Sequence, residues 1–451
     1  MRIIDIIRKK RDGQALTAEE INFFVGTYTS GGISDPQAAA WLMAVVLRGL
    51  NQFELAALTG AMLKSGDIMN LSSLPGKKVD KHSTGGVGDK TSLVVAAVAA
   101  AGGLVVPMIC SRGWDYTGGT LDKLKSIPGF DVNLTLSGFR ASLEACGCAM
   151  IDSPREIAPA EKKLSALSGG TGAFDTPWLI CASIMSRKLA AGVDTLVLDV
   201  KFGSGALMKQ PEDAEFLARL LVETAAIMGK KAVALLTNMN QPLGRAVGNA
   251  LEVSECIDVL RGGGPADVRT LSLELCGWMF FLGECVASVD KGRELAAQLI
   301  SDGRALQKFR ALLRQQHGDD LVLDDRNRLP HAKFRRDLLS TASGCVAKID
   351  GEQIGRACAM LGGGRLGPED IVDPAVGLVL HKKTGDVVTN QEPLVTLHYN
   401  TAQQLDEACA LVQEAFHLTN GARYMPQPLV TKVIECDTKQ LAAEMANWQT
   451  Q

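Results

Sequence analysis

The chain has 451 residues, of which 46% are hydrophobic and 22% charged, and its formal net charge is −3. This length predicts two or three domains with sizeable cores, and the composition is ordinary for a globular α/β enzyme. The charge gives no basic footprint, which argues against a nucleic-acid partner.

The cysteines and the apolar runs favour a soluble, cytoplasmic protein. The eleven cysteines are odd in number and scattered, mostly in apolar runs, which is typical of reduced thiols and not of a disulfide framework. Residues 1–13 have the pattern of a short amphipathic helix, not of a secretory signal. The longest apolar run, 93–109, is interrupted by Gly102, Gly103 and Pro107, so no membrane span is expected.

Helical signals dominate the chain up to about residue 65. Thr17 is an N-cap residue followed by acidic side chains, and Asp35 begins a second helix in the same way. Further along, apolar β-type runs alternate with glycine-rich loops and helical stretches; these runs are 104–109, 195–200 and 232–236. The alternation indicates an α/β sheet with its functional loops at strand ends.

Three regions are expected on this basis. A helical insert between two of the strands is predicted to pack with the N-terminal helices, which gives a discontinuous helical domain of residues 1–65 and 160–191. The α/β sheet takes residues 66–159 and 192–330. The third region, residues 343–440, is richer in β signals.

The first glycine-rich loop, residues 81–92, has the composition of an anion site. Its glycines let backbone N–H groups approach an anion, Lys81 supplies charge, and Ser83 and Ser92 supply hydroxyl donors. The helix expected after it adds a positive N-terminal end. Because the loop is neither a Walker A loop nor a Rossmann fingerprint, it predicts only an oxyanion site, and a plain strand–helix turn is the alternative.

Two further glycine-rich loops follow predicted strands. The second offers the hydroxyl groups of Thr117 and Thr120. Arg112 in the same loop could bind a phosphate or pair with Asp122, and the structural ion pair with Asp122 is slightly favoured. The third loop, residues 201–205, could shape the sheet edge without touching a substrate.

A specific resemblance rests on segments that follow one another along nearly the whole chain. They are Val79-Asp80-Lys81-His82-Ser83-Thr84-Gly85-Gly86-Val87-Gly88-Asp89, Thr117-Gly118-Gly119-Thr120-Leu121-Asp122-Lys123-Leu124, Ser126-Ile127-Pro128-Gly129-Phe130, Asp199-Val200-Lys201 with Gly203-Ser204-Gly205, Asn238-Met239-Asn240-Gln241-Pro242-Leu243-Gly244 and Asp373-Pro374-Ala375-Val376-Gly377. In these segments the chain resembles the thymidine and pyrimidine-nucleoside phosphorylases.

The resemblance implies an α/β fold with a helical domain that dimerises, a large α/β domain with a central mixed sheet, and a smaller C-terminal α/β domain. It also implies phosphorolysis, in which a nucleoside and inorganic phosphate give a free base and α-(deoxy)ribose-1-phosphate. Phosphate is then the co-substrate, no cofactor is required, and the partners are the nucleoside, phosphate and a second copy of the chain.

Residue roles are implied in the same way. Lys81, Ser83, Ser92 and Thr120 would bind phosphate, and Ser183 would hydrogen-bond the base. His82 would sit beside the base carbonyl as a hydrogen-bond donor or acid, for which a pKa near working pH is apt.

The departures from the family pattern fall in this site. Cys110 stands where the family has a serine that donates to phosphate, and a thiol is a much weaker donor. The family's tyrosine and base-binding arginine are Ser165 and Ser168, and its base-binding lysine is Arg187. Loss of a charge-assisted donor to the leaving base would cost on the order of 2–4 kcal/mol of transition-state stabilisation.

Two interpretations of these departures compete. In the first, the pocket is enlarged for another base or a modified nucleoside, with Trp114 and Tyr116 as new walls, although both aromatics could equally be core residues. In the second, selection on pyrimidine binding has lapsed. The first is preferred, because apart from Cys110 the phosphate loop is intact.

Other functions stay open beside the default pyrimidine nucleoside. A 5′-phosphorylated nucleoside would require a basic group near the sugar 5′ position. A non-catalytic homologue would bind phosphate or nucleoside without releasing a base, and the intact Lys81, His82 and Ser83 weigh against it. A phosphoribosyltransferase resembling the anthranilate enzyme would need an acidic metal-binding motif, which the sequence does not show.

The family sometimes holds a monovalent cation, potassium or sodium, at positions that are Gly88, Leu243, Ala246 and Glu255 in this chain. Backbone oxygens would supply most of the ligands, so residue identity is weak support for this site. Lys90 stands beside these positions and could compete with an ion.

Overall fold

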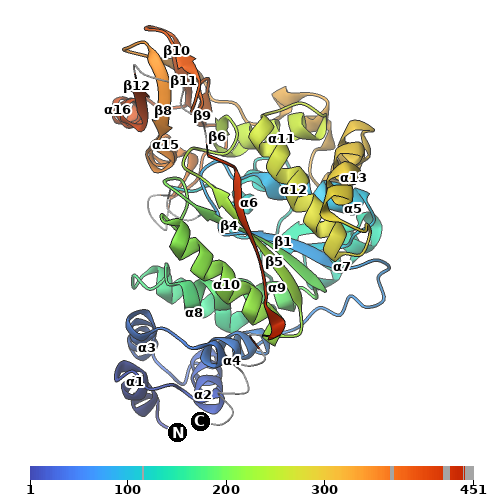
Figure 1. The fold of residues 1–451 in the computed structure, drawn as a ribbon, viewed down its shortest axis with the longest axis vertical. Helices are drawn as coiled ribbons and strands as arrows, with labels where there is room; N and C mark the ends of the chain where they lie inside the picture. Colours follow the sequence, from blue (N-terminus) through green and yellow to red (C-terminus); the bar gives the residue numbers. More distant parts are fainter. Residues whose placement is uncertain (114–115, 366–369, 420–426, 440, 442–451) are drawn as a thin grey trace.

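The computed structural model describes residues 1–113, 116–365, 370–419, 427–439 and 441. The N-terminal helices lie at one end of the molecule, the central sheet in the middle, and most of the C-terminal strands at the opposite end (Figure 1). Within the described part, none of the helices combines the length and apolar character needed to cross a bilayer.

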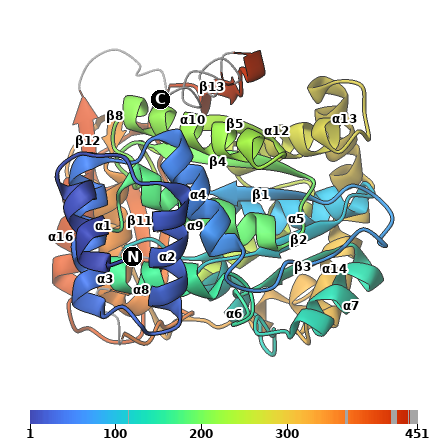
Figure 2. The ribbon, with the colours of Figure 1, turned by 90° about the horizontal axis from the view of Figure 1, so that it is seen from below.

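The helical end is built from two separate stretches of the chain. Its helices are α1 (Ile3–Arg11), α2 (Ala18–Thr29), α3 (Asp35–Arg48), α4 (Gln52–Leu63), α8 (Pro159–Gly169) and α9 (Pro177–Ala190). The later pair packs on three of the earlier helices, with α8 against α2 and α3 and α9 against α4 (Figure 2). The predicted N-cap at Thr17 is confirmed, because its side chain and that of Glu20 form a reciprocal capping box.

The central sheet has the strand order β1-β4-β5-β13. Its strands are β1 (Val79–Ser83), β4 (Thr195–Phe202), β5 (Lys231–Asn238) and β13 (Val430–Glu435). The first three are parallel, and β13 returns antiparallel to β5, so the sheet is mixed, as predicted. The carboxyl ends of β1 and β4 therefore meet at one edge, which is where the glycine-rich loops begin.

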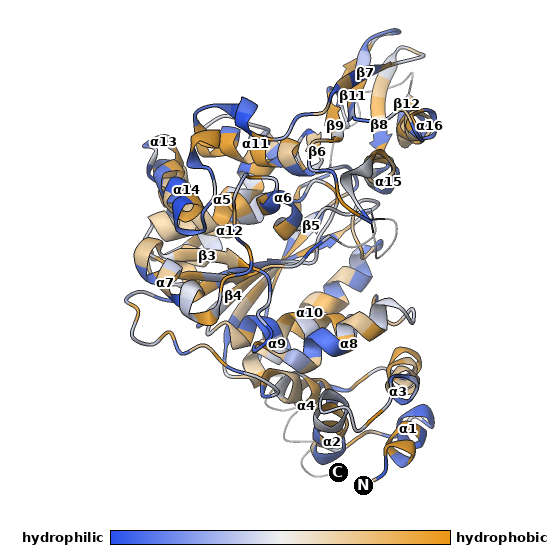
Figure 3. Cartoon of the chain, turned by 180° about the vertical axis from the view of Figure 1, so that it is seen from behind, coloured by the Kyte–Doolittle hydropathy of each residue, from blue (hydrophilic) through white to orange (hydrophobic). Residues whose placement is uncertain are grey.

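Side chains of β4 alternate between two hydrophobic cores. Leu196, Leu198 and Val200 belong to the core shared with the helical end, whereas Val197 faces the second core. The helix α5 (Thr91–Ala101) lies within the second core; after its first two residues it is apolar on all sides, and it is buried along almost its whole length (Figure 3).

The remaining elements complete this middle part. They are β2 (Val106–Ile109), β3 (Cys148–Ile151), α6 (Thr120–Lys125), α7 (Leu136–Cys146), α10 (Pro211–Ile227), α11 (Asn249–Leu260), α12 (Ala266–Leu282), α13 (Val289–Ser301), α14 (Arg304–Gln315) and the short 3₁₀ turns η1 (Asp320–Leu323) and η2 (Arg326–Arg328). β2 and β3 pair in parallel beside the main sheet.

Two small sheets, β6-β9-β11-β7 and β10-β8-β12, form the C-terminal part with two helices. The elements are β7 (Phe334–Leu339), β8 (Gly344–Ile349), α15 (Gly351–Cys358), the π-helical turn η3 (Ala359–Gly363), β9 (Gly377–Leu380), β10 (Val387–Val388), β11 (Pro393–Tyr399), α16 (Leu405–Ala415) and β12 (Phe416–Thr419). The strand β6 (Ala246–Val247) comes from the middle part of the chain and pairs with β9, so this segment joins the two parts.

A buried ion pair between α1 and α4 provides a test of how the helical end is held. Lys10 Nζ lies 2.7 and 2.8 Å from the two carboxylate oxygens of Glu54. Lys10→Met would leave that carboxylate buried without its cation, so we expect the free energy of unfolding to fall by roughly 3–5 kcal/mol. Urea unfolding followed by circular dichroism measures the change.

The control for this prediction is Lys291→Met, which breaks an exposed pair with Glu294 on α13 and is expected to leave the urea midpoint unchanged. A midpoint for Lys10→Met equal to that of the wild type would contradict the predicted contribution of the buried pair.

Candidate active site

A cavity of about 430 Å³ opens between the first two glycine-rich loops and the helices α8 and α9. It brings together most of the candidate residues from the sequence, namely Lys81, His82, Ser83, Ser92, Cys110, Tyr116, Thr120, Ser168, Ser183 and Arg187. Trp114 lies outside the described residues. The cavity is therefore bounded on one side by the anion-type loop and on the other by the helical end.

Lys81 is fixed at the base of the first loop. Its side chain is fully buried, and its ammonium group donates to the hydroxyl oxygens of Thr91, at 2.8 Å, and Ser92, at 3.3 Å. Asp199 on the neighbouring strand β4 lies 3.5 Å away. The ammonium group is thus held at the N-terminus of α5, where the helix dipole also favours an anion.

Asp89 organises the rest of the loop. It accepts hydrogen bonds from the hydroxyl groups of Ser83 and Thr91. Burial alone would raise the pKa of Asp89, but the ammonium groups of Lys201 and Lys81 outweigh burial and hold this pKa far below its usual range. Asp89 is therefore ionised, and the Ser83 hydroxyl is directed toward it.

The second loop differs from the sequence expectation. The predicted ion pair between Arg112 and Asp122 is wrong: Asp122 accepts two hydrogen bonds from Arg365, which lies far away in the sequence. Arg112 lies instead 3.4 Å from Asp152 and is exposed. Its guanidinium group therefore stands at the mouth of the cavity without a strong partner among the described residues.

Cys110 directly follows the strand β2 and lines the cavity. Burial raises the pKa of its thiol to about 12, so the group stays protonated. Its sulfur lies 3.8 Å from the carbonyl oxygen of Met108. The thiol is thus an uncharged, weak donor at this position.

The wall opposite the loop is organised by Glu161, which the sequence analysis did not single out. Its Oε1 accepts hydrogen bonds from Ser183, at 2.6 Å, and Ser165, at 2.7 Å, and lies 3.5 Å from Arg187 Nε. Glu161, Ser165 and Ser168 are spaced by four and three residues on α8, so they share one helix face. That spacing is the signal that could have revealed Glu161.

Arg187 extends across this wall toward the second loop. Its Nη1 donates to Ser111 Oγ at 2.8 Å, and its Nη2 donates to Ser183 Oγ at 3.3 Å. Ser168 lies deeper, only 5% exposed, and its hydroxyl donates to the Ser165 carbonyl oxygen. The guanidinium group is therefore a cationic donor on this side of the cavity.

Tyr116 lines the cavity at its border with the C-terminal part. Its hydroxyl accepts a hydrogen bond from Lys209 and donates to the Ala206 carbonyl oxygen. The Arg356 guanidinium carbon lies 5.1 Å from the ring centroid. Tyr116 is therefore both a wall of the cavity and a contact between the middle and C-terminal parts of the chain.

His82 follows Lys81 on β1 and faces the cavity. Burial and the nearby cations Lys188, Arg187 and Lys81 lower its pKa well below 6.5. The expectation of a pKa near working pH is therefore wrong. The imidazole is neutral, so it offers one N–H donor and one acceptor nitrogen, not an imidazolium proton.

The residues expected to hold a monovalent cation lie apart from the cavity. Gly88, with φ of +78°, packs so closely on Leu243 that a Cβ at this position would lie 2.5 Å from the Leu243 carbonyl oxygen. Ala246 and Glu255 both contact the ammonium group of Lys90.

Comparison with known proteins agrees with this order of parts. Three family models match in succession: the helical bundle domain of a glycosyl transferase family at residues 4–66, the a/b domain of the same family at 75–306, and the pyrimidine nucleoside phosphorylase C-terminal domain at 345–419. A solved structure of anthranilate phosphoribosyltransferase from Thermus thermophilus has the same fold with a TM-score of 0.57, covering 69% of this chain and 99% of its own at 20% identity.

The fold and the family models therefore define a glycosyl transferase. Pyrimidine-nucleoside phosphorylases of Staphylococcus aureus strains USA300 and MSSA476 are each 45% identical to the chain over 434 residues, which is 96% of this chain and 100% of theirs. The chain belongs to the pyrimidine-nucleoside phosphorylase family.

The low pKa of His82 can be tested by NMR of histidine-labelled protein. We expect the His82 resonance, assigned with His82→Gln, to keep the shift of a neutral imidazole from about pH 8 to about pH 6. Arg187→Gln removes one cation that disfavours protonation, so it should move the His82 titration to higher pH. Arg219→Gln, a surface change on α10, is the control. Titration of His82 in the wild type near its ordinary pKa would contradict this description of the site.

Proposed function

We propose that the chain catalyses the phosphorolysis of a nucleoside, with a pyrimidine as the default base. The observation that carries this proposal is a single cavity with two different sides. One side is a loop suited to an anion, and the other is a wall of polar side chains that could hydrogen-bond a base. Membership of the family supports it along nearly the whole length of the chain.

Phosphate is assigned to the side of the cavity formed by the first loop. Lys81 supplies the charge there, and Ser92 and Thr120 supply hydroxyl groups beside it. Ser83 joins them if its hydroxyl turns from Asp89 to the phosphate. Cys110 lies on the same side but adds little, because its protonated thiol is a weak donor.

The base is assigned to the opposite wall, where Arg187, Ser183 and Ser168 lie, with His82 facing it from β1. In the reaction a phosphate oxygen bonds to C1′ of the sugar while the C1′–N bond breaks, and the bonding electron pair leaves with the base. The base takes up the proton that the phosphate gives up. The Arg187 guanidinium group and the His82 N–H would stabilise the negative charge that develops on the base.

Glu161 favours a second candidate, phosphorolysis of a nucleoside whose base carries additional N–H donors. This carboxylate lines the cavity and is an acceptor, whereas the family arginine that Ser168 replaces is a donor. The small side chains of Ser165 and Ser168 leave space beside it. An amino-substituted base could then donate to Glu161.

The default function is tested by base release from a panel of pyrimidine, purine and 5′-modified nucleosides, with and without phosphate. We expect phosphate-dependent release from uridine or thymidine. Arg187→Ala should lower kcat by about 100-fold, because one charge-assisted donor to the leaving base is lost. Arg219→Ala is expected to act like the wild type. No release from any nucleoside, despite measurable phosphate binding, would favour a non-catalytic homologue.

The second candidate is tested with Glu161→Gln, which keeps an acceptor oxygen for Ser183 but removes the charge. If the base donates to Glu161, kcat/KM should fall by about 10-fold for amino-substituted bases and less for uracil nucleosides. Glu144→Gln on the surface of α7 is the matched control. An equal loss for every base would show that Glu161 only holds Arg187 and Ser183 in place.

Dimerisation through the helical domain of residues 1–65 and 160–191 and a cytoplasmic location remain part of the proposal. The proposal also includes the other two domains, an α/β domain of residues 66–159 and 192–330 and a C-terminal domain of residues 343–440. The continuous core between the helical end and one sheet face supports a helical part that packs directly on the sheet.

A further inference from the structure

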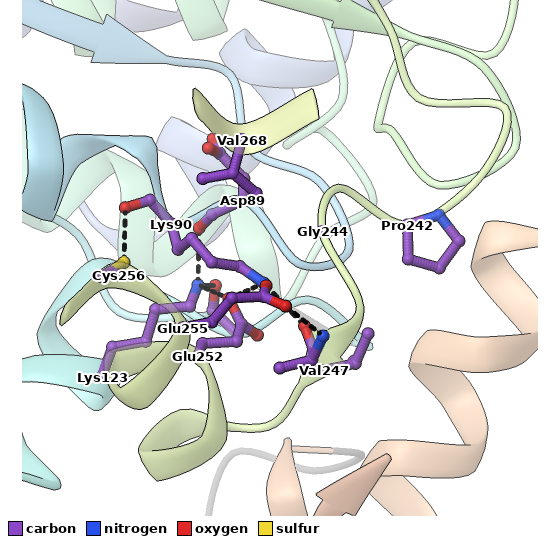
Figure 4. A network of polar contacts seen from close by, with 12 residues as sticks. Asp89, Lys90, Lys123, Pro242, Gly244, Val247, Glu252, Glu255, Cys256 and Val268 are labelled. Carbon is purple, nitrogen blue, oxygen red and sulfur yellow. Dashed lines mark hydrogen bonds and ion pairs between the residues drawn. The ribbon is translucent and has the colours of Figure 1, made fainter. Parts of the chain in front are cut away.

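Lys90 is buried behind the first glycine-rich loop and is directed away from the cavity. Its side chain is fully buried, and its Nζ donates to the Ala246 carbonyl oxygen at 2.7 Å and to the Glu255 carboxylate. Glu252 Oε2 lies 4.0 Å from the same nitrogen. Figure 4 shows Lys90 beside Glu252 and Glu255.

Two of the residues whose oxygens surround Lys90, Ala246 and Glu255, are positions that the family resemblance assigns to a monovalent cation. Both the Ala246 carbonyl and the Glu255 carboxylate are already bound to the ammonium group. The backbone leaves no spare room, since a Cβ at Gly244 would lie 2.9 Å from Lys90 Nζ and 2.1 Å from Glu255 Oε2. A metal cation therefore does not fit this site together with Lys90.

Charge balance leads to the same conclusion. Lys123 Nζ, the second buried ammonium group here, lies 3.3 Å from Glu252 and donates to the carbonyl oxygens of Asp89 and Gly118. Two ammonium groups are thus matched by the two carboxylates Glu252 and Glu255. A further cation would bring an uncompensated charge into a buried site, which is strongly unfavourable.

We propose that the Lys90 ammonium group takes the place of the monovalent cation, so that the phosphate loop of this chain is ordered without potassium or sodium. An ammonium group and a potassium ion carry the same charge and are similar in size. Lys90 is then a positioning residue, because its side chain lies outside the cavity and acts through the loop to which it belongs. The kinetic part of this inference rests on the proposed phosphorolysis.

The contacts of Lys90 also connect the phosphate loop to the C-terminal part of the chain. Ala246 begins β6, which pairs with β9 of the C-terminal part. From the C-terminal side, Lys383 Nζ donates to the Gly244 carbonyl oxygen at 2.7 Å and lies 3.2 Å from Asp267. The segment 242–247 is thus held by one lysine from each part, and Lys90 links it to the phosphate loop.

The test compares the wild type with Lys90→Thr, in which a small hydroxyl side chain opens the site. Activity is measured in buffer free of alkali ions and then with rising potassium, while tetramethylammonium chloride keeps the ionic strength constant. We expect the wild type to be insensitive to potassium. Lys90→Thr should have at least a 10-fold higher KM for phosphate without alkali ions, and potassium should restore it with a saturable dose dependence.

Thermal unfolding gives a readout that does not depend on turnover. The Tm of Lys90→Thr should rise with potassium but not with tetramethylammonium, whereas the Tm of the wild type and of Lys291→Thr should respond equally to both salts. If no nucleoside reacts, this readout still tests the inference separately from the proposed function.

Two results would overturn the inference. One is specific activation or stabilisation of the wild type by potassium, which can be measured even if Lys90→Thr does not fold. The other is a folded Lys90→Thr protein whose KM and Tm do not respond to potassium, because Lys90 would then act only through its own packing and hydrogen bonds.

Discussion

Buried ion pairs beneath the glycine-rich loop are the feature on which the rest of the site depends. Lys81, Lys90, Lys123 and Lys201 are among the largest fully buried side chains in the described part of the molecule. Each lies within 3.5 Å of a buried carboxylate: Asp199 for Lys81 and Lys201, Glu255 for Lys90, and Glu252 for Lys123. Removing one member would leave its partner charged and buried, which is costly, so the network constrains the loop strongly.

The network also separates two tasks. Lys81 and Asp89 set the electrostatics of the side that faces the cavity, where the helix N-terminus and the hydroxyl groups favour an anion. Lys90 and Lys123 hold the back of the same loop against α11 and the segment that leads to the C-terminal part.

On the opposite wall, Glu161 holds the polar groups around Arg187, and Arg187 helps to keep His82 neutral. In the proposed reaction the donors to the leaving base are therefore the fixed guanidinium group of Arg187 and a neutral imidazole.

Local signals in the sequence predicted the parts of the fold that local physics determines. The N-cap at Thr17, the apolar strands and the helix after the first loop follow from patterns within short stretches of sequence, and the structure confirms them. The partner of Asp122 could not be predicted in this way, because Arg365 comes from a distant segment.

The same limit applies within the site. The low pKa of His82 arises from cations on β1 and α9 together with burial, and no single sequence window contains all of them. For Glu161 the sequence holds one signal, its helical spacing from Ser165 and Ser168, which places the three side chains on one face of α8. The sequence shows that Lys90 stands close to one of the cation positions, Gly88. Only the folded chain shows that its ammonium group contacts Ala246 and Glu255.

The most direct test of the account is a crystal structure of the protein grown with saturating inorganic phosphate. We expect phosphate at the N-terminus of α5, within hydrogen-bonding distance of Lys81 Nζ and Ser92 Oγ, with the pair between Lys90 and Glu255 unchanged behind it. Phosphate bound elsewhere, with the loop empty and Lys81 still directed only to Thr91, Ser92 and Asp199, would contradict the assignment of this loop as the phosphate site.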